Sequence, residues 1–368
     1  MRVAFAIVLV VHGLIHLLGV AKAFELAELP QLIRPIPPVI GMVWLAATLL
    51  FLLAAGALFL WPRWWWAIGA VAIAVSMIAI VPSWTDAKIG ALANLVALAG
   101  VVLGFLADGP VSQRAAYERD VARLLTPSAG AGVLTDADLT PLPTPVQRYL
   151  RTSGVIGQPR VRNLRARMHG RIRQAPDSRW MPFTAEQHNF FERPARLFYM
   201  DASMLSIPVH VFHRYVAASA TMRARAAGLV PVADMSGSEM TQAETVTLFN
   251  DMCIMAPATL VEPTITWETI DAHRVRASFT NAGHTIRAEL TFNDAGELTN
   301  FSSDDRRRAS PDGRTMTPIR WSTPIGSYRA FGPVRLTGRG EGRWHEPGGE
   351  YAYIELELDE VEYNVQPR

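Results

Sequence analysis

The chain has 368 residues, a formal net charge of +2 and a mean hydropathy of +0.15, so it is longer than one ordinary domain and nearly balanced in charge. It has no basic stretch with interleaved aromatic residues, and this excludes the usual pattern of a nucleic-acid-binding surface. A single cysteine, Cys253, excludes an intramolecular disulfide.

The first third of the chain is dominated by four apolar stretches, residues 3–20, 39–60, 64–81 and 89–107. Each has about 18–22 residues, and a helix needs roughly 20 to cross the hydrocarbon core of a bilayer. Helices are expected because lipid offers the backbone no hydrogen-bonding partner. Prolines follow the first stretch, and short connections follow the second and third. Residues 1–107 are therefore predicted to form an antiparallel bundle of four transmembrane helices.

A cleavable signal peptide is the alternative for the first stretch. Arg2 precedes it, and Ala21-Lys22-Ala23 after it has small residues at the positions that a signal peptidase reads. The stretch is longer than the apolar core of most signal peptides and long enough to span a bilayer. A first transmembrane helix is therefore predicted.

Two histidines, His12 and His16, lie four residues apart in this stretch and share one helix face. Ionisable groups within a bilayer indicate function, here a contact with haem, quinone or a metal, or a proton relay. In the simpler interpretation, neutral imidazoles hydrogen-bond to a neighbouring helix. The other apolar stretches supply no second histidine pair for a metal or a bis-histidine haem. We predict no metal ligands and no cofactor.

Four spans would place the N-terminus and the C-terminal part on one side of the membrane. That side would carry more basic residues, namely Arg2, Arg63, Arg114, Arg119 and Arg123, against Lys22, Arg34 and Lys88 on the other. The positive-inside rule then favours a cytoplasmic location for the C-terminal part.

Residues 108–159 are predicted to join the two parts. A helix over residues 111–125 is amphipathic, and its arginines either contact anionic headgroups or are simply solvated. A linker rich in glycine and proline covers residues 127–145. Thr144-Pro145 then opens a short helix that ends before Gly154.

From residue 160 to the C-terminus the hydrophobic period changes to two. Residues 164–172 alternate apolar side chains with Arg165, Arg167, His169 and Arg171, as in a strand with one buried face. The arginine row is interpreted as an open edge or a solvated face, with an anion-binding stripe as the alternative. Further strands follow without intervening helices, which predicts an antiparallel sheet.

One long helix interrupts the strands. Ser238 is its expected cap, and Met240, Val246 and Phe249 belong to an apolar stripe that ends before Ala256-Pro257. The predicted fold is an α+β domain over residues 160–368, in which a curved antiparallel sheet, or half-open barrel, holds this helix in its concave face. Such a domain commonly encloses an apolar cavity.

The candidate ligand-binding residues are Met240, Glu244, Phe249, Asn250, Asp251 and Trp267. Glu244 and Asp251 lie seven residues apart on nearly the same helix face and could act as an acid/base pair. The simpler interpretation places them on a solvated helix face or in bonds to strand backbone, so no catalytic residue is predicted.

Other polar groups give weaker signals. His210 and His213 face opposite sides of a strand, which argues against a shared metal. Residues 304–308, Asp-Asp-Arg-Arg-Arg, are interpreted as a solvated loop with local ion pairs. No phosphate loop, nucleophile elbow or zinc signature is present.

Several motifs resemble a family of bacterial membrane proteins of unknown function. They are His12-Gly13-Leu14-Ile15-His16, Gln242-Ala243-Glu244-Thr245, Leu248-Phe249-Asn250-Asp251-Met252, Thr280-Asn281-Ala282-Gly283-His284 and Phe292-Asn293-Asp294-Ala295-Gly296. The strand order with one long helix also resembles the half-barrel of lipoprotein carriers of the LolA/LolB type. The apolar helices resemble, more distantly, quinone-linked membrane proteins of the DoxX type.

The family that the motifs resemble has no established activity. The pairing of a membrane bundle with an expected apolar-lined cavity predicts an integral protein of the bacterial inner or plasma membrane whose soluble half-barrel binds a lipid or another hydrophobic ligand. Its expected partners are membrane lipids and no nucleic acid, and no enzymatic activity is predicted. The alternative is a membrane oxidoreductase, or its partner, that uses haem or quinone at the His12/His16 face.

Overall fold

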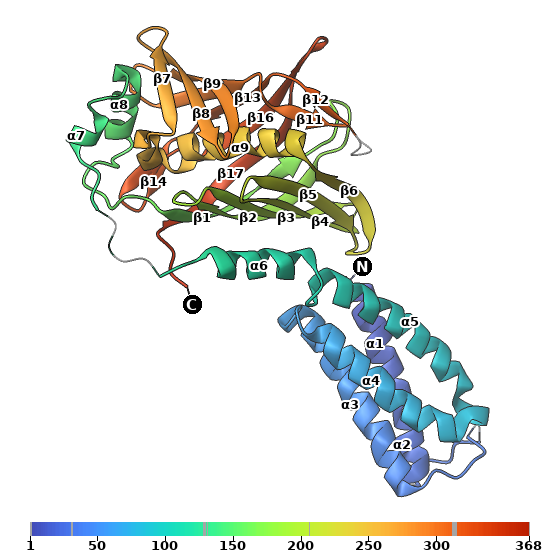
Figure 1. Cartoon of the computed structure of the whole chain (residues 1–368). Helices are drawn as coiled ribbons and strands as arrows, with labels where there is room; N and C mark the ends of the chain where they lie inside the picture. Colours follow the sequence, from blue (N-terminus) through green and yellow to red (C-terminus); the bar gives the residue numbers. More distant parts are fainter. Residues whose placement is uncertain are drawn as a thin grey trace. The chain divides into compact units, whose positions relative to one another are not determined.

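The computed structural model describes residues 2–30, 32–127, 130, 132–205, 207–310 and 315–367. The chain forms two compact units, Met1–Ala116 with Ala227–Leu229, and Tyr117–Ala226 with Val230–Arg368. Three residues of the predicted linker, Ser128, Ala129 and Ala131, lie outside the described part. Figure 1 shows the helices of the first unit in blue and the sheet of the second in green to red.

The first unit is helical. Its elements are α1 (Arg2–Ile15), α2 (Leu17–Ala23), α3 (Pro38–Leu60), α4 (Trp65–Ile80), the 3-10 turn η1 (Val81–Ser83), α5 (Trp84–Asp108) and the start of α6 (Gln113–Leu124). Within the described residues, three continuous helical stretches are long and apolar enough to cross a membrane, Arg2–Ala23, Pro38–Leu60 and Trp65–Leu124. The predicted count of four separate helices is therefore not reproduced. Pro82 lies at the start of η1, where its missing N–H is tolerated, so α4 continues into α5 through a tight turn.

The helices of this unit pack closely at glycines and expose aliphatic side chains outward. A Cβ on Gly100 would lie 2.1 Å from the ring of Phe5, and one on Gly104 would lie 2.2 Å from Trp65. Gly100 and Gly104, which form a G-x-x-x-G pair on α5, therefore serve helix packing. Val39 and Ile89 on the outer surface are 75% and 78% exposed, as suits side chains that face lipid.

The second unit contains a large sheet and few helices. The helical elements are the end of α6, α7 (Asp136–Leu139), α8 (Thr144–Thr152), α9 (Ser238–Met255) and the 3-10 helix η2 (Pro257–Val261). The strands are β1 (Asn163–Ile172), β2 (Met181–Phe190), β3 (Ala195–Met204), β4 (Ile207–Val216), β5 (Ser219–Ala226), β6 (Val230–Ser236), β7 (Ile265–Thr269), β8 (Arg274–Asn281), β9 (His284–Phe292), β10 (Leu298–Ser303), β11 (Arg307–Ala309), β12 (Met316–Pro318), β13 (Trp321–Gly326), β14 (Arg329–Phe331), β15 (Val334–Leu336), β16 (Arg339–Glu346) and β17 (Gly349–Tyr363).

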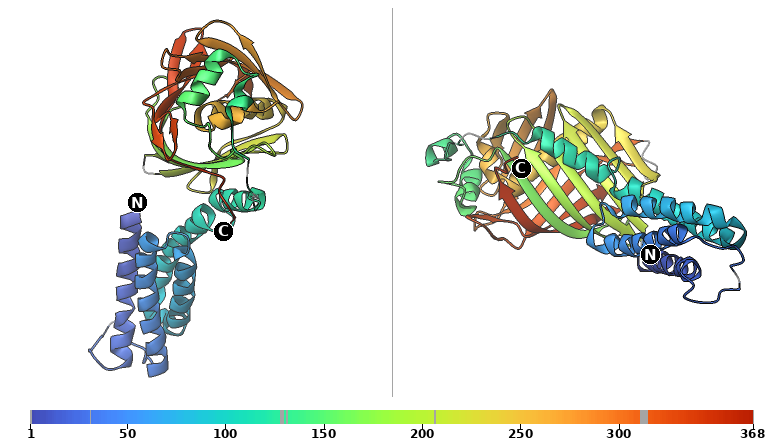
Figure 2. Two further views of the ribbon diagram at one scale, coloured as in Figure 1. Left: turned by 90° about the vertical axis from the view of Figure 1, so that its left-hand side faces the viewer. Right: turned by 90° about the horizontal axis from the view of Figure 1, so that it is seen from below.

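Thirteen of these strands form one antiparallel sheet in the order β6-β5-β4-β3-β2-β1-β17-β16-β13-β10-β9-β8-β7. Helix α9 contacts β5 and β6 near one end of this order and β9 and β10 near the other. A single helix can touch both wings only if the sheet bends around it, as Figures 1 and 2 show. The end strands β6 and β7 are not paired with each other in the described residues, so the barrel is half open. This confirms the predicted curved antiparallel sheet.

Helix α9 is buried on all sides rather than on one face. From Met240 to Met255, only Gln242 is not fully buried. The expected solvated face does not exist, because the two wings of the sheet cover opposite sides of the helix. Its N-cap is Gly237 and not Ser238, since the backbone leaves β6 at φ 97°, a conformation that favours glycine.

The arginine row of β1 lies on the outer face of the sheet. The prediction of an open edge is wrong, because β1 pairs with both β2 and β17. Arg165 bonds Glu186 at 2.9 Å and Arg171 bonds Glu355 at 2.8 Å, so neighbouring strands supply the counter-charges. The alternative interpretation, a solvated face with ion pairs, agrees with this geometry.

Candidate ligand cavity

A cavity of about 570 Å³ lies between α9 and the concave face of the sheet. This volume falls within the range of about 300–1,000 Å³ that is typical of small-molecule sites. Helix α9 lines it with Met240, Glu244, Thr247, Asp251 and Ile254. These residues recur at intervals of three and four and, together with Asn250 and Met255, which also line the cavity, form one broad face of the helix.

Most of the cavity wall is apolar, and methionine is unusually frequent in it. The aromatic and aliphatic wall residues include Phe183, Phe198, Trp321, Trp344, Tyr353 and Leu356. The methionines are Met168, Met200, Met222, Met235, Met240, Met255 and Met316, more than half of the 13 in the chain. Methionine side chains are flexible and polarisable, so they can repack around apolar molecules of different shape.

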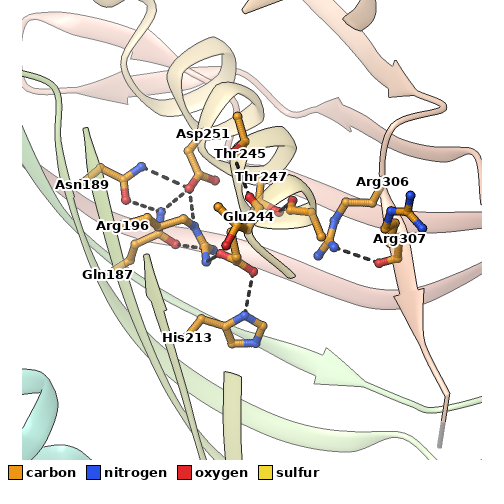
Figure 3. Close-up of polar contacts among 12 residues, drawn as sticks. Gln187, Asn189, Arg196, His213, Glu244, Thr245, Thr247, Asp251, Arg306 and Arg307 are labelled. Atoms are coloured by element: carbon orange, nitrogen blue, oxygen red, sulfur yellow. Dashed lines mark hydrogen bonds and ion pairs between the residues drawn. The ribbon is translucent and has the colours of Figure 1, made fainter. Parts of the chain in front are cut away.

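A cluster of buried polar side chains forms part of the same wall. Gln187 and Asn189 alternate along β2 and so point to one face of the sheet, and Arg196 lies opposite Asn189 on β3. From α9, Glu244 and Asp251 point toward them, and Figure 3 shows this convergence.

Arg196 is the centre of this cluster. Its Nε donates to Asp251 Oδ2 at 2.6 Å and its Nη1 donates to Glu244 Oε2 at 3.0 Å. Asp251 Oδ2 also accepts from the side-chain amides of Gln187 at 2.7 Å and Asn189 at 3.1 Å. The other oxygen of Glu244 lies 2.9 Å from Nδ1 of His213. The two carboxylates thus share one guanidinium inside a low-dielectric wall.

The two carboxylates respond to this environment in opposite directions. Burial raises the pKa of Glu244, but the attraction of Arg196, then that of His213, outweighs burial and holds this pKa well below its usual value. Burial also raises the pKa of Asp251, and here Arg196 only partly offsets the effect. One cation therefore keeps Glu244 ionised and leaves Asp251 as the more easily protonated member of the pair.

Arg306, between β10 and β11, also lines the cavity and is only 9% exposed. Its guanidinium carbon lies 5.5 Å from the ring centroid of Trp321 and 5.8 Å from that of Trp344. Its neighbours along the chain have carboxylate partners, since Arg307 bonds Glu239 and Arg308 pairs with Glu346. Arg306 has no carboxylate within ion-pairing distance in the described residues.

The structure places four of the six candidate residues on the cavity wall, namely Met240, Glu244, Asn250 and Asp251. Phe249 points to the opposite side of α9, where its ring stacks on Phe279 at 5.2 Å. Trp267 lies beside Phe249 at 6.5 Å, away from the cavity. Phe249 and Trp267 belong to the packing of α9 against β7 and β8 and form no part of the proposed site.

The simpler interpretation of Glu244 and Asp251 is wrong, and the interpretation of residues 304–308 as a solvated loop is wrong for Arg306. Glu244 and Asp251 are not solvated but buried and ion-paired to the sheet. Arg306 does not lie in a solvated loop, because the concave sheet turns it toward α9. Sequence reasoning missed Arg196, Arg306 and Gln187 as site residues. The sequence pattern around these residues is a weak signal of a site, because polar residues that alternate with apolar ones along a strand are also typical of a solvated face.

His210 and His213 point to opposite faces of β4, as their spacing predicts. His213 faces the cavity and Glu244, whereas His210 lies 3.7 Å from Asp201 on the other side. The described residues contain no group of three or more histidine, cysteine, aspartate or glutamate side chains arranged to hold a metal ion.

The helical unit has its own buried polar cluster. His12 Nε2 lies 2.9 Å from Asn94 Oδ1, and His16 Nε2 lies 2.8 Å from Ser76 Oγ. Asn94 Nδ2 donates to Ser76 at 2.9 Å, which joins α1, α4 and α5. These contacts are those of the simpler interpretation, in which the histidines hold neighbouring helices together.

Comparisons with known proteins agree with the predicted membership in a family of unknown function. The model of the Family of unknown function (DUF6544) matches residues 132–356, more than half of the chain, so the chain belongs to this family. No curated protein matches the chain.

Solved structures with detectable similarity come from several bacteria. A LolA superfamily protein from Nitrosomonas europaea is 10% identical, with a TM-score of 0.36 over 60% of this chain and 94% of that one. A putative outer membrane lipoprotein-sorting protein domain from Vibrio parahaemolyticus is 8% identical, with a TM-score of 0.31 over 55% and 85%. A DUF1329 family protein from Desulfovibrio piger is 10% identical, with a TM-score of 0.35 over 61% and 94%.

Proposed function

We propose that the soluble unit binds a lipid, or another flexible hydrophobic molecule, in the cavity beside α9. The observation that carries this proposal is the cavity of about 570 Å³ in a concave face whose wall is rich in methionine and aromatic side chains. A sheet that only needed a core would be filled by its own side chains, because protein interiors are close-packed. An apolar cavity of this size is instead the usual form of a small-molecule site.

The helical unit would hold this binding domain at a membrane. We propose that α1 with α2, then α3, α4 and α5 each cross the bilayer, which makes the protein multi-pass. The support is the apolar composition of these helices and the aliphatic side chains on their outer surface. The excess of arginine near the ends predicted to share a side with the soluble unit favours a cytoplasmic location.

Photocrosslinking in the full-length protein tests this function. The protein would be placed in phosphatidylcholine nanodiscs and exposed to a 16-carbon alcohol with a diazirine in mid-chain. Saturable labelling of peptides from β3 or α9, located by mass spectrometry and competed by unlabelled hexadecanol, is expected. Labelling confined to α1–α5 would contradict a binding role for the cavity.

A pair of variants sharpens the test. Met240→Trp and Met200→Trp each fill part of the cavity from opposite walls, so each should reduce labelling at β3 and α9 by about fivefold or more. Met204→Trp is the matched control, because Met204 is 41% exposed and lies outside the cavity wall. Two filling variants are used so that the test still stands if one of them is destabilised, which a lowered thermal midpoint would show.

A further inference from the structure

The Arg306 side chain is a cationic group in an otherwise mostly apolar wall. Burial of a guanidinium is costly unless it is paired and hydrogen-bonded, and buried arginines are therefore nearly always matched by carboxylates. Arg196 on the same wall follows this rule with two partners. Arg306, in contrast, has no carboxylate partner among the described residues.

The hydrogen bonds of Arg306 leave donors unused. Its Nη1 donates to the backbone carbonyl of Arg307 at 3.0 Å. Its Nε is buried and has no acceptor in the described part of the chain. The rings of Trp321 and Trp344 hold the guanidinium by cation–π contact but accept no conventional hydrogen bond from it.

The buried carboxylate of Glu244 forms no ion pair with Arg306 and is paired with Arg196 and His213 instead. Arg306 lies close enough to lower the pKa of Glu244, although burial, Arg196 and His213 act on that group more strongly. Both oxygens of Glu244 are already bonded, one to Arg196 and one to His213. The attraction of Arg306 to Glu244 is therefore long-range, and Glu244 accepts no hydrogen bond from Arg306.

A second polar group lines the same cavity. Thr323 follows Trp321 by two residues on β13 and so shares its face of the sheet. Thr323 donates from Oγ1 to Asn250 Oδ1 at 2.7 Å, and Asn250 lines the cavity from α9. Asn250 and Thr323 are therefore further polar side chains on the wall that a ligand would meet.

From this geometry we infer that the cavity ligand carries an acidic headgroup, a carboxylate or a phosphate monoester, which Arg306 binds while the chain lies among the methionines. This inference rests on the proposed function. An oxyanion would supply the missing counter-charge and accept from the unused guanidinium N–H groups, whose fork geometry matches two oxygens of a carboxylate or a phosphate. It would not need to displace an existing ion pair, because Arg306 makes none with a described residue.

The experiment compares three probes on the full-length protein in phosphatidylcholine nanodiscs. They share a 16-carbon chain with a mid-chain diazirine and end in a hydroxyl, a carboxylate or a monophosphate. The acidic probes should label cavity peptides at concentrations about tenfold or more below the alcohol, as a charge-assisted hydrogen bond in a buried site implies. Preference for the carboxylate points to free fatty acids, and preference for the phosphate points to phospholipid-like headgroups.

Three variants at two arginines locate the preference. Arg306→Gln should abolish the advantage of the acidic probes while labelling by the alcohol persists, and Arg306→Lys should retain part of it. Arg320→Gln removes a nearby arginine that is 46% exposed, pairs with Asp304 and lies outside the cavity wall, so the advantage should remain.

The outcomes separate the two proposals. Equal labelling by all three probes in the wild-type protein, or an acidic preference that survives in Arg306→Gln, overturns the headgroup inference and leaves the binding function standing. No saturable labelling by any probe overturns the binding function as well. The comparison of the three probes in the wild-type protein needs no variant. It therefore still tests the preference for an acidic headgroup if Arg306→Gln fails to fold.

Discussion

Arg196 on β3 and Asp251 on α9 meet at 2.6 Å between Nε and Oδ2, although they lie 55 residues apart in the sequence. The same guanidinium reaches Glu244, two turns earlier on α9, at 3.0 Å. One side chain of the sheet is therefore bonded to two positions on one face of the helix. This double contact fixes the rotation of α9 about its axis, so the same helix face always borders the cavity.

Replacement of Arg196 should destabilise the soluble unit strongly. Arg196→Met leaves Glu244 and Asp251 buried without their shared cation, and breaking such a pair costs about 3–5 kcal/mol. Hydrogen exchange of the α9 peptide in the full-length protein would report the loss. Arg223→Met is the control, because Arg223 and Asp234 form an ion pair on the surface and its removal should change exchange very little. Similar protection of α9 in both variants would contradict a structural role for the bridge.

Neutralising Glu244 and neutralising Asp251 should change the stability of the soluble unit in different ways. Glu244→Gln removes a charge that its surroundings stabilise, so at pH 7 it should lower the free energy of unfolding by about 2–4 kcal/mol. Asp251→Asn removes a charge that burial disfavours and keeps an oxygen that can accept from Gln187, Asn189 and Arg196. Its thermal midpoint at pH 7 should equal or exceed that of the wild type. A larger loss in Asp251→Asn than in Glu244→Gln would reverse this assignment.

The same pair predicts a pH dependence with a defined sign. The folded-state pKa of Asp251 lies above its usual value of 3.8, so between these two values the native state binds more protons than the unfolded state. The wild type should therefore gain stability from Asp251 as the pH falls through this window, by at most about 1.4 kcal/mol per pH unit. Asp251→Asn lacks this gain, so its advantage should shrink from pH 7 to about 4.

Glu244 contributes with the opposite sign. Its folded-state pKa lies below its usual value of 4.5, so its stabilisation is complete above that value and is lost as the pH falls further. Thermal midpoints of the wild type, Asp251→Asn and Glu244→Gln between pH 3 and 8 would show both effects. A gap between the wild type and Asp251→Asn that widens on acidification to pH 4 would be inconsistent with a raised pKa for Asp251.

The polar cluster of the helical unit should stabilise helix packing to a modest degree. Asn94→Leu removes the acceptor of His12 and a donor to Ser76, and hydrogen bonds between membrane helices contribute on the order of 0.6–1.7 kcal/mol each. Unfolding of the full-length protein by SDS in mixed micelles measures this loss. Leu95→Ala is the control on the same helix, because Leu95 is 60% exposed and should matter little.

Close contact between β1 and β17 makes Gly170 sensitive to any side chain. A Cβ at this position would lie 2.0 Å from the carbonyl oxygen of Glu355, so two central strands would have to separate. Gly170→Ala should cost about 1–3 kcal/mol, as overpacking usually does. Gly326→Ala on β13 meets no atom within 4 Å and should leave the thermal midpoint nearly unchanged. Equal midpoints in the two variants would show that the strands can separate at little cost.

Local chemistry was sufficient to predict much of this protein. Apolar stretches near membrane length predict long apolar helices, and the described residues contain three helical stretches long and apolar enough to cross a membrane. Alternation in residues 164–172 predicts a strand, and the run of strands without helices predicts an antiparallel sheet. The face of Glu244 and Asp251 also follows from their spacing of seven residues on a helix.

The surroundings of those carboxylates were decided only by the tertiary structure. An amphipathic pattern cannot show that a sheet of 13 strands bends until both wings cover the same helix, since curvature depends on pairing between distant segments. That bend brings Arg196 to Asp251 and turns Arg306 inward from what the sequence presents as a charged loop. Long-range packing, which local periodicity does not encode, sets which polar groups are buried and hence where the candidate site lies.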